Sequence, residues 1–425
     1  MKKIIASMLA CSAMLTFNAC QEDDDFTESI FDTTISAVDQ NSATAPFDQW
    51  LYDNFVAPYN TEIQYKFNFT ASDLNYQLSP SDYKKSQLLA HFIKYLFYDV
   101  YNKYGEKDAH GNEVFMKKYG PRIFHFIGSD AFSPTTNTET LGYASAGVKI
   151  TLIGVNNMRT VSDDMDFTAD DMEMLNHYQF HTMHHEFSHI MHQTKVYPTA
   201  YSLVTPGTYD PRTWQERDST LTHQLGYLTH YGSSASTEDF VETLSCTITD
   251  SDHRWMTTII DACLNGGVKN GDKEAVYELL DSLEIANIQD PVLSTFDDPS
   301  HYWNDFSIYA ESAQNEETGV YESTGRYVID AHLADSRQQA KTPLKFEFVQ
   351  SFSSFRDFLD NWVEYDMTSD TGGINAILKK IDIATKWYTE NWGLHLFTMR
   401  REVRYRQDHV NDYVHSNECI IYDYQ

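Results

Sequence analysis

The feature that most constrains this chain is a histidine-rich segment, MLNHYQFHTMHHEFSHIMHQ, at residues 174–193, which holds six of the seventeen histidines. Within it, HEFSH places His185 and His189 four residues apart, with Glu186 beside the first. Residues four apart share one face of a helix, so both imidazoles can reach one ion. Glu186, rotated by about 100°, can touch a water on that ion without binding the ion itself. The segment therefore predicts a helix that faces a cleft.

The segment also fits the HExxH arrangement of zinc hydrolases. Met183, Phe187, Ile190 and Met191 form the opposite, apolar face of the same helix. A buried helix with its polar stripe turned into a cleft is what the motif requires. The alternative is a histidine-rich surface helix.

The remaining histidines can be ranked by their angle around the helix. His181 and His192 lie within about 40° of His185, so they border the site and could contact substrate or orient ligands. His184 lies about 100° to the side, and His177 is two turns back. We expect His184 and His177 to be ordinary polar residues.

The third zinc ligand is not in this segment. A catalytic zinc has three protein ligands and one open position. The longer pattern HExxHxxGxxH fails, because His192 stands in the place of glycine and Lys195 in the place of the last histidine. A lysine ammonium has no lone pair to offer a metal.

An acidic residue on a later helix is the alternative third ligand. The sequence STEDFVETL offers Glu238 and Glu242, four residues apart on one helix face. We expect Glu238, in the first turn after a Ser/Thr cap, to bind zinc, and Glu242 to accept a hydrogen bond from a ligand histidine. Asp239 is the alternative ligand. The competing interpretation is a solvated acidic helix start, which the helix dipole favours.

Composition excludes one class of partner. Among 425 residues, acidic side chains outnumber basic ones 62 to 31, which gives a net charge of −31. Because such an acidic surface repels phosphate backbones, we expect no nucleic-acid partner. The three cysteines that follow Cys20, namely Cys246, Cys263 and Cys419, are too scattered to form a disulfide framework.

The N-terminus predicts export. MKKIIASMLACSAMLTFNAC has a positive start and a short apolar core, which is typical of a secretion signal. Its end, FNAC, resembles a bacterial lipoprotein cleavage box with Cys20 as the lipidated residue; the alternative is a plain signal peptide. The QEDDD that follows resembles the surface-export signal of lipoproteins in the Bacteroides group. These features predict a signal at 1–19, a tether at 20–45, and an outer-membrane lipoprotein that is surface-exposed or, alternatively, periplasmic.

The order of the expected elements indicates an α+β fold. We expect strands at 61–69, 122–128 and 148–154, and helices at 79–105, through the histidine segment, and from 236. Further helices are expected at 273–283, 355–363 and 374–388. The domain prediction is a catalytic region at 46–255 and a helical subdomain at 256–425 that packs on it.

HExxH followed by ExxxE resembles the gluzincin peptidases, such as thermolysin and anthrax lethal factor. The resemblance implies a zincin-like domain, with a small twisted sheet and an active-site helix, and a bound Zn²⁺. Tyr231 precedes Glu238 by seven residues, an offset at which lethal-factor-like peptidases place an oxyanion-stabilising tyrosine. Tyr227, His223 and His230 compete for that role.

With the lipoprotein signal, the two motifs also resemble a narrower group, the zinc metallopeptidase lipoproteins of Bacteroides-type bacteria, which are associated with TonB-linked nutrient import. The implied function is hydrolysis of peptide substrates, with Glu186 as the base. The alternative is a surface binding protein with a vestigial zinc site, in which Trp387 and Trp392 could form a binding platform. Residues beyond about 255 carry no matching motif.

Overall fold

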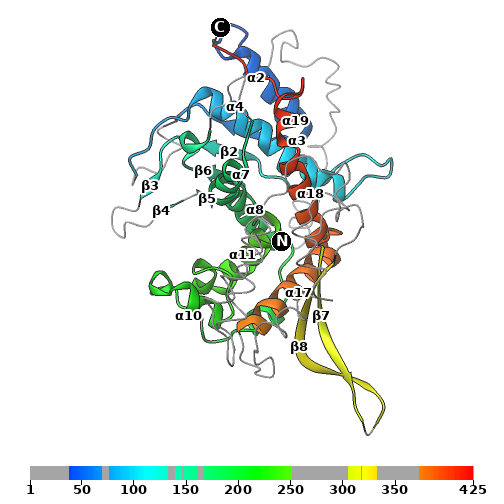
Figure 1. Ribbon diagram of the computed structural model, residues 1–425. Helices are drawn as coiled ribbons and strands as arrows, with labels where there is room; N and C mark the ends of the chain where they lie inside the picture. The colour runs from blue at the N-terminus through cyan, green and yellow to red at the C-terminus, as the bar shows by residue number, and fades with distance from the viewer. Residues whose placement is uncertain are drawn as a thin grey trace, which may run out of the picture.

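The computed structural model describes residues 38–68, 76–132, 139–140, 142–145, 148–159, 166–250, 305–316, 318–332 and 373–424 (Figure 1). Cys20, the predicted signal and most of the predicted tether lie outside these residues, as do the predicted helices at 273–283 and 355–363. Among the described residues, no helix has the length and hydrophobicity needed to cross a membrane.

A four-stranded mixed sheet supports the centre of the molecule. Its strands lie in the order β1 (Glu62–Gln64), β2 (Ile123–Phe126), β6 (Lys149–Leu152) and β5 (Gly142–Ser145). The first three strands run parallel, and β5 pairs antiparallel to β6 at the edge. The strands expected at 122–128 and 148–154 are confirmed. The strand expected at 61–69 has only three residues, although Ile63 and Tyr65 are buried as its alternation predicts.

Most of the other elements are helices. The label η marks short 3-10 or π-helical turns. In chain order up to Thr249 the helices are α2 (Ala45–Leu51), η1 (Tyr52–Val56), α3 (Ala57–Tyr59), α4 (Tyr83–Phe92), η3 (Ile93–Tyr98), α5 (Asp99–Tyr104), α6 (Phe115–Tyr119), η4 (Val155–Asn157), α7 (Ala169–Leu175), η5 (Asn176–Phe180), α8 (His181–Thr194), α9 (Thr199–Ser202), η6 (Trp214–Glu216), α10 (Ser219–Gln224), η7 (Tyr231–Ser234) and α11 (Ser236–Thr249). A short ribbon pairs β3 (Ala131–Phe132) with β4 (Glu139–Thr140). The helix expected at 79–105 is present as α4, η3 and α5, and Asp82 caps it by accepting from the Lys85 amide.

The histidine segment forms one long helix in three stretches, α7, η5 and α8. Thr168 and Asp171 close a capping box at its start. Helix α8 then packs against β5 and β6. Gly142 on β5 permits this close approach, because a β-carbon there would collide with the side chain of Thr182.

The C-terminal part combines helices with a hairpin. Helices α17 (Gly373–Trp392), α18 (Leu396–Asp408) and α19 (Val410–Val414) run back along the molecule, while the hairpin of β7 (Asp305–Gln314) and β8 (Tyr321–His332) projects away from it (Figure 1). The helix expected at 374–388 is confirmed, but the region 256–425 is not helical throughout. Trp387 and Trp392 are buried in the core, so the idea that they form a binding platform is wrong.

Helices therefore cover a small sheet in an α+β, zincin-like fold, as expected. Val38 and Thr44 are already buried, so the folded part includes the last residues of the predicted tether. The domain boundaries otherwise stay predictions.

A buried histidine in α4 predicts how stability responds to acid. The ring of His91 is fully buried, and its nitrogens lie 3.3 Å from the Tyr413 hydroxyl and 3.1 Å from the Ile420 carbonyl oxygen. Burial lowers the pKa of His91 from 6.5 to about 4, against the hydrogen bond to the Ile420 carbonyl. Between these values the unfolded chain takes up a proton that the folded chain does not, so the free energy of unfolding falls as pH drops from about 6.5 to 4.

We expect the urea midpoint of the metal-free protein to fall across this pH window, and to fall less in His91→Gln than in the wild type. Metal-free protein is used because acid also releases metal from histidine ligands. Equal pH dependence in the two proteins would contradict the assignment.

Candidate metal centre

Two helices supply the side chains of the centre. Helix α8 carries His185 and His189, and α11, which lies against it, carries Glu238 and Glu242. The N-cap of α11 is Ala235, with no side-chain cap, so the expectation of a Ser/Thr cap is wrong. Glu238 nonetheless lies in the first turn of α11, as predicted.

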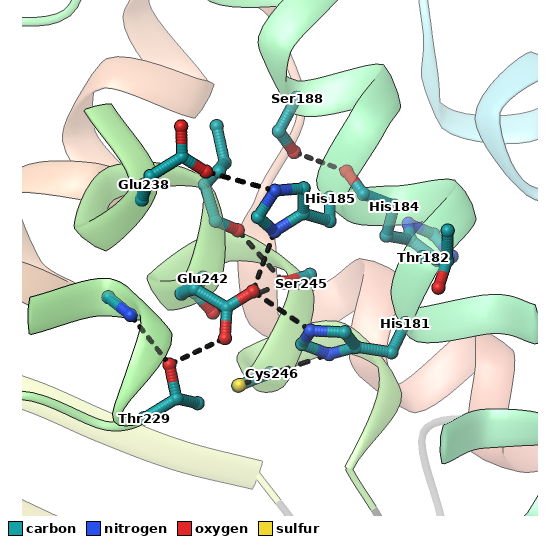
Figure 2. Close-up of polar contacts among 12 residues, drawn as sticks. His181, Thr182, His184, His185, Ser188, Thr229, Glu238, Glu242, Ser245 and Cys246 are labelled. Carbon is teal, nitrogen blue, oxygen red and sulfur yellow. Dashed lines mark hydrogen bonds and ion pairs between the residues drawn. The ribbon is translucent and has the colours of Figure 1, made fainter. Parts of the chain in front are cut away.

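Three potential ligand atoms, from His185, His189 and Glu238, converge between the helices. Figure 2 shows two of these residues, His185 and Glu238, facing each other. The Oε2 atom of Glu238 lies 3.3 Å from Nε2 of His185 and 3.3 Å from Nε2 of His189. Oε2 is buried and makes no hydrogen bond of good geometry. A tetrahedral zinc with ligands about 2.0–2.2 Å away has neighbouring ligand atoms about 3.3–3.5 Å apart. The two measured separations of 3.3 Å match this distance between neighbouring ligand atoms, so the three residues fit a zinc ion.

The electrostatics of the centre favour a cation. Burial alone would lower the pKa of His185, but the Glu238 carboxylate facing Nε2 and the hydrogen bond between Nδ1 and Glu242 raise it to about 10. Burial would raise the pKa of Glu238, yet His185 and His189 hold it well below its usual range. The buried carboxylate of Glu242 and the partly buried carboxylate of Glu238 thus face the imidazoles, and a metal ion can take the place of a shared proton.

Glu242 holds His185, the first candidate ligand, in place. Its Oε1 atom lies 2.6 Å from Nδ1 of His185, which leaves Nε2 of that ring pointing toward Glu238 (Figure 2). The other oxygen, Oε2, accepts a hydrogen bond of 2.6 Å from the Thr229 hydroxyl. A carboxylate on the far nitrogen of a zinc-bound histidine fixes its tautomer and orientation. Glu242 is therefore placed for the orienting role expected from its spacing.

Glu186 and Tyr231 flank the converging atoms. Glu186 follows His185 on α8 and is nearly buried. The ring of Tyr231 lies 5.7 Å from that of His185, and its outer side contacts the Trp214 ring at 5.1 Å. Burial raises the pKa of Tyr231 above its usual value, and the nearby Glu238 and Glu186 carboxylates add to the shift. Its hydroxyl therefore stays protonated and can donate a hydrogen bond.

The other histidines of the segment differ in where they lie relative to the centre. His181 and His192 border the centre as expected: Nε2 of His181 lies 2.9 Å from Glu242 Oε1, and Nε2 of His192 lies 3.0 Å from His189 Nδ1. His177 is half-buried. The expectation for His184 is wrong, because its ring is buried in the core beside the Tyr101 hydroxyl, 3.0 Å from Nδ1. His184 shares a helix face with Phe187 and Met191, which is the signal that could have placed it.

Asp239, the alternative ligand, is engaged elsewhere. Its carboxylate lies 2.7 Å from Nζ of Lys380 on α17 and accepts a hydrogen bond from Tyr209. Neither Asp239 nor His192 joins the three converging atoms, so neither of these two residues closes a fourth coordination position.

The competitors of Tyr231 lie in different surroundings. Tyr227 is fully buried, and its hydroxyl lies 2.7 Å from that of Thr208. His223 is buried, and His230 is half-buried. The ring contact with His185 therefore favours Tyr231 among these groups.

Two supporting residues were not expected from the sequence. Thr229 binds Glu242 from a loop and carries no motif. Lys380 could have been suspected, because it shares a helix face with the buried Ile377 and Ala384.

Comparisons with known proteins identify the family to which the chain belongs. A family model described as "Putative zinc-binding metallo-peptidase" matches residues 40–286, which is more than half of the chain. A solved structure from Bacteroides caccae, described with the same words, aligns with a TM-score of 0.51 at 21% identity, over 91% of this chain and all of that one. No curated protein sequence matches significantly. The chain belongs to the family of zinc-binding metallopeptidases that this model describes.

Proposed function

We propose that this chain is a zinc-dependent peptidase of the gluzincin type, with His185, His189 and Glu238 as the zinc ligands. The observation that carries the proposal is the position of Glu238 Oε2, which is buried, lacks a good hydrogen bond and lies 3.3 Å from both ligand nitrogens. Glu186 is the immediate neighbour of His185 on α8. A purely structural zinc would not need such a base, which argues against a vestigial site in a binding protein.

Each side chain around the zinc position has its own role in the proposed reaction. Bound zinc supplies Lewis acidity, which polarises the scissile carbonyl and makes a water more acidic. Glu186 accepts a proton from the attacking water and passes it to the leaving amine. Glu242 keeps Nε2 of His185 turned toward the zinc position throughout.

Tyr231 is proposed to donate a hydrogen bond to the developing oxyanion. Replacing it with phenylalanine keeps the ring, and therefore its packing on His185 and Trp214. We expect Tyr231→Phe to lower kcat by about 10²-fold, with a smaller change in KM, because the donor acts in the transition state. Steady-state kinetics on a cleaved peptide would measure both. An unchanged kcat would show that another donor fills this role.

The test of the proposed function is a cleavage assay with a peptide library. The zinc-loaded wild type should cleave a subset of peptides at internal bonds. Chelation should stop cleavage, and stoichiometric zinc should restore it. The binding-protein alternative is correct if the zinc-loaded wild type binds peptides of a diverse library without cleaving any, and the Glu186→Gln variant binds those same peptides.

We further propose that the enzyme is a lipoprotein anchored through Cys20, exposed on the outer membrane and linked to TonB-dependent nutrient uptake. The support is the N-terminal sequence, with its short apolar signal, FNAC and QEDDD. Metabolic labelling with a fatty acid should mark the wild type and not Cys20→Ala. Protease digestion of whole cells would then distinguish surface exposure from a periplasmic location.

A further inference from the structure

The two helices that build the zinc centre continue their pairing beyond it. Three side chains on α8 and three on α11, each set spaced by four residues, face one another along the helix interface: His189, His185 and His181 against Glu238, Glu242 and Cys246. The zinc centre uses one end of this series. The other end brings together an imidazole, a carboxylate and a thiol.

These three groups lie within metal-binding reach of one another (Figure 2). Nε2 of His181 is 2.9 Å from Oε1 of Glu242, and Nδ1 of the same ring is 4.0 Å from Sγ of Cys246. One ligand atom from each residue falls within a mutual span of 4.8 Å. Only one of the two His181 nitrogens can bind a given ion. Around a tetrahedral zinc, nitrogen and sulfur ligands are about 3.5–3.6 Å apart, so the three side chains must draw closer together to share an ion.

We propose that His181, Glu242 and Cys246 bind a second divalent cation, zinc in the cell. An imidazole and a thiolate favour zinc over magnesium or calcium, which prefer oxygen ligands. Glu242 and Cys246 are 4% exposed, so they form the buried wall of this site. The His181 side chain is 21% exposed and gives access from solvent.

The two sites share one carboxylate. Oε1 of Glu242 contacts both His181 and His185, while Oε2 is held by the Thr229 hydroxyl. A cation on His181 would displace its hydrogen bond to Glu242, and Cys246 would bind as a thiolate and release its proton to solvent. The second cation should therefore bind more weakly than the first.

Cobalt reports on this site separately, because the His185, His189 and Glu238 site contains no sulfur. The metal-free full chain would be titrated with Co²⁺ and followed by its thiolate-to-cobalt charge-transfer absorption. We expect two bound cobalt ions and a sulfur band that grows with the second. Cys246→Ser and His181→Asn should each bind one ion and lose the band, whereas Cys419→Ser and Cys263→Ser should keep both.

Binding of a single cobalt ion without the sulfur band would overturn the proposal, and so would a band that survives in Cys246→Ser. In either case His181 serves only as a hydrogen-bonding partner of Glu242. His189→Asn, which disables the first site, should retain the band. Because the band does not depend on catalysis, its absence would leave the proposed peptidase activity standing.

Discussion

Replacing Glu186 with glutamine is expected to lower kcat for peptide cleavage by about 10²–10⁴-fold. Glutamine has nearly the same shape, but its amide cannot accept the proton of the attacking water. Glu186 is the neighbour of the proposed ligand His185 on α8, and it supplies none of the three converging atoms. The variant should therefore bind zinc in the same amount as the wild type.

Zinc content by mass spectrometry and kcat on one peptide test this expectation together. Glu390→Gln, at an exposed position of α17, is the matched control and should behave as the wild type. Full activity in Glu186→Gln would refute the role of the base. Loss of zinc together with activity would instead make Glu186 a ligand.

Replacing Lys380 with methionine is expected to destabilise the fold by about 3–5 kcal/mol. Nζ of Lys380 lies 2.7 Å from Asp239 Oδ2, 2.8 Å from the Gly226 carbonyl oxygen and 4.0 Å from the centre of the Tyr227 ring. Both charged side chains are 2% exposed. Methionine fills similar space but leaves the Asp239 carboxylate buried without its counter-charge.

Restoring charge balance should recover much of that loss. Burial raises the pKa of Asp239 and lowers that of Lys380, each against the attraction of its partner, so the charged pair gains little net stability. The double variant Asp239→Asn with Lys380→Met should therefore be more stable than Lys380→Met alone.

Urea unfolding of the metal-free proteins measures these differences. Lys379→Met changes an exposed neighbour on α17 and should have little effect. A loss below about 1 kcal/mol in Lys380→Met would contradict the buried pair. Because Asp239 follows Glu238 on α11, the single variant should also bind zinc more weakly.

The sequence predicts those parts of the site that lie on single helices. Four-residue spacing places His185 with His189, and Glu238 with Glu242, whatever the rest of the chain does. It also predicts that the two pairs belong to one centre, because zinc needs a third ligand that the histidine segment does not provide.

The parts that sequence could not supply depend on contacts between distant segments. Lys380 meets Asp239 across 141 positions in the sequence, and Thr229 reaches Glu242 from a loop. The buried position of His184 depends on Tyr101, which comes from α5, 83 positions earlier in the chain. The π-helical turn η5 contains His177, ends just before His181 and has a different number of residues per turn from an α-helix. The position of His177 around the helix therefore cannot be calculated from His185 with α-helical geometry.

The central claim is that one zinc ion sits between His185, His189 and Glu238. The most direct measurement is a crystal structure of the zinc-loaded protein with anomalous diffraction at the zinc edge. The account predicts an anomalous peak about 2.0–2.2 Å from both Nε2 atoms and from Glu238 Oε2. A fully loaded protein with no peak between these three atoms would contradict it.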